Sequence, residues 1–156
     1  MWPGIDVRTA WLAAIIGPML ERGQDSQPHW VYVIEIAPKW IPLVKPSLDP
    51  GTQCLYVGET SHPPGKRFHQ HRRGLSYGET GANAAARPFQ RIRNERLELG
   101  LHGTLVDGED AWLRRDLMES SDPVGGDEAS KSLELETAER LRSVGFHVFG
   151  PKPKAD

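Results

Sequence analysis

The sequence has a single cysteine, Cys54, among 156 residues. One thiol cannot form an internal disulfide framework, and it cannot supply the ligands of a cysteine-rich zinc site. A chain stabilised without disulfides is typical of a reducing compartment. We therefore predict a cytoplasmic protein whose stability comes from a hydrophobic core.

Long hydrophobic runs are also absent. The most apolar stretch, AWLAAIIGPML at residues 10–20, is interrupted by Gly17-Pro18 and is shorter than the roughly 20 apolar residues that span a bilayer. Asp6 weakens the basic leader that a signal peptide requires. We expect no contact with a membrane, and we assign residues 1–29 to a short N-terminal helix and a polar linker.

Neither a repeat period nor extended low complexity is visible, and 38% hydrophobic with 26% charged residues is typical of one soluble domain. We place this domain at residues 30–150 and a tail at residues 151–156. The net charge of -2 shows no overall excess of positive charge. An average over the chain can still conceal a basic surface.

Two segments rich in β-branched and aromatic residues predict strands, WVYVIEI at residues 30–36 and CLYVG at residues 54–58. No helical pattern separates them, so we expect them to pair antiparallel. The intervening residues 37–53 contain four prolines and predict an irregular connection.

Helical spacing predicts three helices after these strands, at residues 64–73, 86–100 and 128–143. Both GTLVDG and AWLRRDLM, between residues 101 and 118, are candidates for a third strand, and we favour the second. The predicted fold is α+β, with a small three-stranded antiparallel sheet flanked by helices in the order β-β-α-α-β-α and with an extra N-terminal helix. Four residues are expected on the inner side of the second helix: Phe89, Ile92, Arg96 and Leu99.

Glu134 occupies an unusual place on the last helix. On a helical wheel it lies at the centre of the apolar face, between Ala138 and Leu141, whereas Glu136 and Glu139 face solvent. A carboxylate that faces the domain body must be paired, protonated or bound to a cation. A buried ion pair with an arginine and a functional role both remain open for Glu134.

Two further patterns surround this carboxylate. Arg67 and His71 are four residues apart and share one face of the predicted helix at residues 64–73. Tyr32 and Tyr56 each lie in the middle of a predicted strand, a position typical of a core aromatic. Taken together, these five residue types suit phosphodiester chemistry, which needs an activated water, a cation for the phosphate and a metal ligand.

This set, in this order, resembles the GIY-YIG nuclease superfamily. The matching segments are WVYVIEI, LYVGETSHPPGKRFHQH and LELETAERLRSVGFHV, and the resemblance runs from about Trp30 to Gly150, which is most of the chain. Trp30 stands where the family has glycine, and Val57 stands where it has isoleucine. Arg67 lies one residue further from Tyr56 than in many members, and the loop between the strands is longer.

The resemblance implies a catalytic site made of Tyr32, Tyr56, Arg67, His71 and Glu134. In the family one tyrosine acts as, or positions, the general base, the arginine stabilises the phosphate, and the glutamate binds one divalent metal. For this chain the resemblance implies Glu134 as the ligand of Mg2+ or Mn2+, and a DNA substrate, with branched or damaged DNA as candidates. The alternative is a non-catalytic module of the same fold that binds nucleic acid or a protein partner, in which Glu134 and Arg67 form a structural pair. The sequence predicts no oligomeric state.

Charge is distributed unevenly along the chain. Residues 60–96 carry eight basic and two acidic residues, a net charge of +6, whereas residues 97–156 carry a net charge of -6. The basic block coincides with the two helices that follow the second strand, where a phosphate backbone is expected to lie. Six residues are predicted to contact the nucleic acid: Lys66, Arg72, Arg73, Arg87, Arg91 and Arg93.

Overall fold

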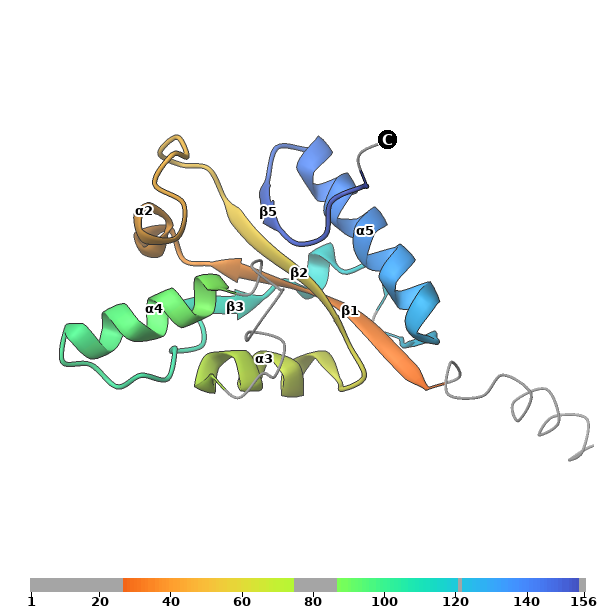
Figure 1. Ribbon diagram of the computed structural model, residues 1–156, viewed down its shortest axis with the longest axis horizontal. Helices are drawn as coiled ribbons and strands as arrows, with labels where there is room; N and C mark the ends of the chain where they lie inside the picture. Colours follow the sequence, from red (N-terminus) through yellow and green to blue (C-terminus); the bar gives the residue numbers. More distant parts are fainter. Residues whose placement is uncertain (1–26, 75–86, 121, 155–156) are drawn as a thin grey trace, which may run out of the picture.

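The computed structural model describes residues 27–74, 87–120 and 122–154. Within these ranges the chain has an α+β fold, as predicted (Figure 1). Its strands are β1 (Pro28–Ile36), β2 (Cys54–Thr60), β3 (Ala111–Leu113), β4 (Val124–Gly125) and β5 (His147–Phe149). Its helices are α2 (Ile41–Val44), α3 (Pro64–Arg73), α4 (Arg87–Glu98) and α5 (Asp127–Ser143), with short 3-10 helices η2 (Pro38–Trp40) and η5 (Arg115–Leu117).

The sheet is mixed and contains five strands within the described ranges, so the prediction of a three-stranded antiparallel sheet is wrong in this detail. Strand β1 pairs antiparallel with β2 along its length and with β3, and these three are the predicted strands. Strand β5 adds to the other side of β2 in parallel, and β4 pairs with the start of β1. Two or three residues are too few for an alternating pattern, which is why the sequence did not reveal β4 and β5.

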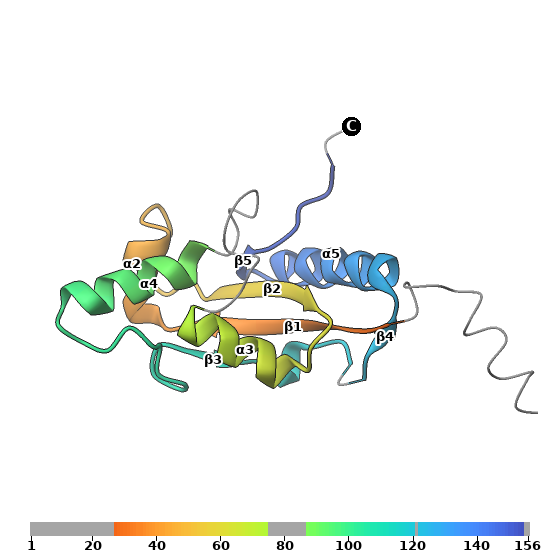
Figure 2. The same cartoon turned by 60° about the horizontal axis from the view of Figure 1, so that its bottom comes forward.

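Helices cover both faces of this sheet (Figures 1 and 2). Alternate side chains of β1 point to opposite faces of the sheet. Tyr32 and Ile34 lie in the core shared with α3 and α4, whereas Val31 and Val33 lie in the core beneath α5. Because both faces are covered, β1 is buried from Val31 onward.

The predicted helices agree with α3, α4 and α5 to within about two residues. Pro64 opens α3, and Gly74 ends it in the left-handed conformation at φ 74°. Residues 37–53 are less irregular than predicted, since they contain η2 and α2. On α4, the predicted inner residues Phe89, Ile92 and Arg96 are buried, but Leu99 follows the end of the helix and is exposed.

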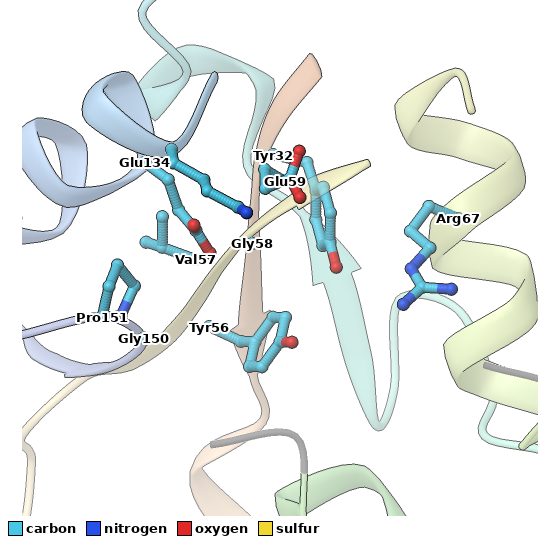
Figure 3. A pocket seen from close by; sticks show the side chains of 10 residues that line it. Tyr32, Tyr56, Val57, Gly58, Glu59, Arg67, Glu134, Gly150 and Pro151 are labelled. Carbon is cyan, nitrogen blue, oxygen red and sulfur yellow. The ribbon is translucent and has the colours of Figure 1, made fainter. Parts of the chain in front are cut away.

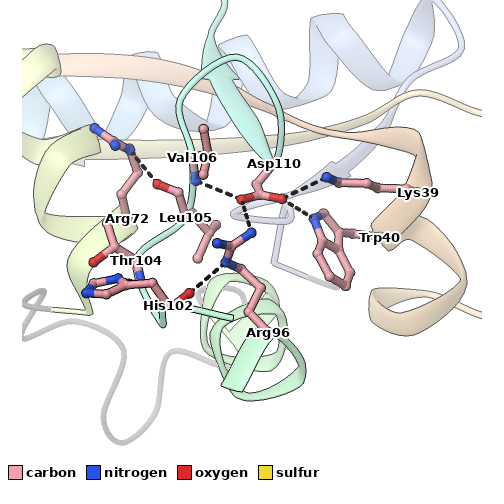
Figure 4. A network of polar contacts seen from close by, with 9 residues as sticks. All are labelled: Lys39, Trp40, Arg72, Arg96, His102, Thr104, Leu105, Val106 and Asp110. Carbon is pink, nitrogen blue, oxygen red and sulfur yellow. Dashed lines mark hydrogen bonds and ion pairs between the residues drawn. The ribbon is translucent and has the colours of Figure 1, made fainter. Parts of the chain in front are cut away.

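A buried carboxylate connects three parts of this framework (Figure 4). Asp110 is fully buried and accepts hydrogen bonds from Arg96 Nη1 at 2.9 Å, Trp40 Nε1 at 2.8 Å and the backbone N–H of Val106 at 2.7 Å. Lys39 Nζ lies 3.1 Å from Asp110 Oδ1, the oxygen that also accepts from Trp40. Burial opposes ionisation, but these donors keep the pKa of Asp110 below its usual range. The arginine that the sequence placed on the inner side of α4 thus anchors that helix to η2 and to the loop before β3.

No helix within the described ranges is both long enough and apolar enough to cross a bilayer. The predicted N-terminal helix lies outside the described residues.

Candidate active site

A pocket of about 240 Å3 opens at one edge of the sheet and is lined by side chains from β1, β2, α3 and α5 (Figure 3). Four of the five predicted catalytic residues line it: Tyr32, Tyr56, Arg67 and Glu134. These residues are separated by up to about a hundred positions in the sequence, and the fold brings them to one place. Their catalytic roles stay predictions.

The edge of β2 explains how residues from both faces of the sheet meet. Strand β5 pairs only with Cys54–Tyr56, so among the described strands none pairs with Val57–Thr60 on that side. The chain after β5 packs there instead, since a Cβ atom added to Gly150 would lie 3.1 Å from the carbonyl oxygen of Val57. Around this edge Glu134 of α5 and Tyr32 of β1 reach the same pocket (Figure 3).

Gly58 is required by the position of Tyr32. The two residues are directly paired across β1 and β2, and a Cβ atom at Gly58 would lie 2.5 Å from Tyr32 Oη and 3.0 Å from the ring of Tyr56. Real carbon and oxygen atoms do not approach this closely without rearrangement. The glycine of the Tyr-Val-Gly motif therefore makes room for the hydroxyl of the first tyrosine.

His71 does not line the pocket but lies behind Tyr32. The Tyr32 hydroxyl and His71 Nε2 are 2.7 Å apart, and both side chains are buried. The imidazole also packs against the rings of Tyr56 and Phe89, with centroid distances of 5.2 and 4.8 Å. The fold thus places Tyr32 between the pocket and His71, with the Tyr32 hydroxyl within hydrogen-bond distance of the imidazole.

The environment of Tyr32 keeps its hydroxyl protonated at neutral pH. Burial raises the pKa of Tyr32 well above its ordinary value, and neighbouring Tyr56 raises it further, whereas the guanidinium of Arg67 opposes the shift. A free phenolate is therefore not the resting form.

Arg67 lines the pocket and has one unsatisfied donor. Its Nη1 donates to Gln70 Oε1 at 3.3 Å, but its Nε is buried and has no hydrogen-bond partner among the described residues. A buried donor without an acceptor costs about 1–3 kcal/mol. A phosphate group in the pocket would match the geometry of the Arg67 guanidinium.

Glu134 lies across the pocket from Arg67 and is half-buried (Figure 3). No hydrogen bond or ion pair joins its carboxylate to another described residue, so the buried ion pair considered from the sequence does not occur among them. Burial first, and then the nearby carboxylate of Glu59, raise the pKa of Glu134 to about 7. An uncompensated carboxylate of this kind fits a hard divalent cation such as Mg2+ or Mn2+.

Two of the six predicted nucleic-acid contacts have structural partners. Arg72 Nε donates to the carbonyl oxygen of Leu105 at 2.8 Å, and Arg93 Nη1 donates to that of His71 at 2.8 Å. Arg93 also packs where a side chain on Gly74 would lie. The side chains of Lys66, Arg73 and Arg91 are exposed, and that of Arg87 lies outside the described residues.

Sequence reasoning missed several pocket residues. Glu59 and Lys131 line the pocket, as does Pro151, which the sequence analysis assigned to the tail. Strand alternation was the available signal for Glu59, because it shares a side of β2 with Val57, beneath α5.

Neither a protein-family model, nor a curated protein, nor a solved structure matches this chain. What the pocket does is therefore inferred from the chemistry of its side chains and from the resemblance of its motifs.

Proposed function

We propose that this chain is a divalent-metal-dependent nuclease that hydrolyses phosphodiester bonds in DNA, with the fold and site of the GIY-YIG superfamily. The observation that carries the proposal is the pocket shared by Tyr32, Tyr56, Arg67 and Glu134. It combines a cationic donor, two hydroxyl groups and a carboxylate without an ionic partner among the described residues, which are the groups that hydrolysis of a phosphate diester uses.

Each residue has a role that its surroundings permit. Tyr32 accepts a proton from the attacking water while its own proton passes to His71 Nε2, 2.7 Å away, so no free phenolate is needed. Arg67 donates to the phosphate oxygens on which negative charge develops. Tyr56 borders the pocket beside Tyr32, with ring centroids 6.0 Å apart, and its proposed role is to orient the water.

Glu134 would hold the metal ion. Glu59 lines the same pocket, and its carboxylate raises the pKa of Glu134. A bound Mg2+ or Mn2+ supplies neutralisation of the charge on the phosphate during attack. Because the pocket would supply the ion with few protein ligands, we expect weak metal binding in the absence of DNA.

The alternative of a non-catalytic module required Glu134 and Arg67 to form a structural pair. These side chains lie on opposite sides of the pocket without an ion pair between them, which favours the catalytic proposal (Figure 3). A module that only binds nucleic acid would retain DNA without turning it over.

The test is cleavage of supercoiled plasmid and of flap DNA with Mg2+. We expect Glu134→Gln and Arg67→Ala each to reduce the cleavage rate about 100-fold or more, because each removes an electrostatic contact made at the reacting phosphate. Glu136→Gln, on the exposed side of the same helix, is the matched control and should cleave normally. Undiminished cleavage by both active-site variants would overturn the proposal, and binding without turnover by the wild-type protein would support the module.

A further inference from the structure

A second group of metal-ligating side chains lies on the α5 side of the sheet, at the start of β1. His29, Glu59 and Asp127 each offer one ligand atom, and these three atoms all lie within 4.8 Å of one another. His29 Nδ1 is 2.9 Å from Glu59 Oε2. Glu134 is not a member of this group, although Glu59 also lines the pocket that contains Glu134.

The backbone fixes the three residues relative to one another. The β1–β2 register pairs Val31 with Glu59, so His29 lies on the same side of the sheet, one diagonal step from Glu59. The β1–β4 register pairs His29 with Val124, and α5 begins at Asp127 three residues later. Two strand pairings therefore determine where all three ligands lie.

We propose that His29, Glu59 and Asp127 bind a divalent transition-metal ion of the Zn2+ class. One imidazole nitrogen and two carboxylate oxygens, with water as a fourth ligand, form a donor set that Zn2+ accepts in tetrahedral geometry. Tetrahedral bonds of about 2.0–2.1 Å place neighbouring ligands roughly 3.3 Å apart, so only small side-chain adjustments separate the observed positions from a closed site. The site does not depend on the proposed nuclease activity.

The neighbouring side chains suit such a site. Ser130 Oγ donates to Glu59 Oε2 at 2.8 Å, an orienting contact of the kind that metal-binding carboxylates receive. Glu59, Asp127 and Glu134 bring three carboxyl groups close together, and besides His29, Lys131 is the one basic residue among the described residues that is paired with them, at 2.9 Å from Asp127. A divalent ion would balance this charge.

Lys131 pairs with one of the three proposed ligands and is therefore expected to affect metal affinity. Its ammonium group forms an exposed ion pair with the carboxylate of Asp127. Exposed ion pairs are weak, so a metal ion can displace the ammonium group. It competes with the ion for the same carboxylate, so its removal should strengthen metal binding. If the three residues served only to anchor α5 to the sheet, Lys131 would have no effect on metal affinity.

The experiment titrates Zn2+ alone into the full chain by calorimetry and follows Co2+ alone by its visible absorption, which reports tetrahedral coordination. We expect one ion per chain, with affinity reduced at least 10-fold in His29→Gln and in Asp127→Asn, and raised several-fold in Lys131→Gln. His69→Ala, which removes an exposed histidine of α3, is the control and should bind normally. Circular dichroism establishes that each variant is folded.

Two results would overturn the proposal. The first is Zn2+ binding by the wild-type chain that is no tighter than binding by folded His29→Gln and Asp127→Asn. The second is loss of the Co2+ spectrum in Glu134→Gln but not in Asp127→Asn, which would move the ion to the nuclease pocket. A spectrum that survives in Glu134→Gln, with DNA cleavage lost, would separate the two sites.

Discussion

Glu134 carries a charge that the fold does not balance with a salt bridge among the described residues. The helical wheel placed it on the inner face of α5, and the structure places it half-buried at the pocket beside Glu59 and Lys131. Its position could be predicted because a carboxylate between Ala138 and Leu141 interrupts an apolar stripe. Its surroundings could not, because Glu59 comes from another strand and only the pairing of β1 with β2 brings the two together.

The raised pKa of Glu134 predicts that the metal-free protein loses stability as pH rises. The pKa of Glu134 increases from 4.5 in an unfolded chain to about 7 in the folded protein, so the folded state holds the proton more tightly. This contribution is complete below pH 4.5, declines up to pH 7 and is absent above it. With allowance for solvent screening of a half-buried group, it amounts to about 2 kcal/mol.

Glu134→Gln should remove this dependence. We expect the variant to gain stability relative to the wild-type protein between pH 5 and pH 8, measured by urea unfolding in the presence of EDTA. Glu136→Gln should follow the wild-type protein across the same range. A difference between Glu134→Gln and wild type that does not change with pH would show that the carboxyl group is not held in its protonated form.

At the scale of elements, the sequence predicted what local patterns control and missed what long-range pairing controls. The α3 helix could be located because Pro64 and Gly74 mark its two ends. The short strand β5 could not, because His147–Phe149 has too few residues for a pattern and becomes a strand only by pairing with β2. The same holds for the pocket, which forms where β5 stops at the level of Tyr56 and the chain after β5, rather than another strand, lies beside Val57.

The position of α4 depends on Asp110, and removal of its charge should destabilise the fold. In Asp110→Asn, the Arg96 guanidinium would lose its buried carboxylate, and a buried pair broken on one side costs about 3–5 kcal/mol. We expect the melting temperature to fall by about 10 °C. Asp116→Asn is the matched control, because Asp116 pairs with Arg114 on the surface and should have little effect. Equal melting temperatures for the two variants would contradict the anchoring role.

At the scale of the whole molecule, the helices on the two faces of the sheet differ in charge, because α3 and α4 have more basic than acidic residues and α5 has more acidic than basic residues. The basic block at residues 60–96 contains α3 and α4, which share one core with Tyr32 and Tyr56. The acidic block at residues 97–156 contains α5, on the other face. The near-neutral total therefore conceals a polarity, and DNA is expected to approach from the side of α3 and α4.

This polarity predicts which cations contribute to DNA affinity. Arg72 and Arg93 hold backbone carbonyls, so among the described residues of the predicted set Lys66, Arg73 and Arg91 are the ones with exposed side chains. A triple glutamine variant at those three positions should bind flap DNA more weakly at low salt, and the slope of log K against log salt should become shallower by about 2–3, since each phosphate contact contributes roughly 0.9. Fluorescence anisotropy across a salt series measures both quantities, and a double glutamine variant at Lys152 and Lys154, exposed residues after β5, is the control.

If the control reduces the slope as much as the triple variant does, DNA does not lie along α3 and α4. If the triple variant lowers affinity without changing the slope, its residues act through the fold rather than through phosphate contacts.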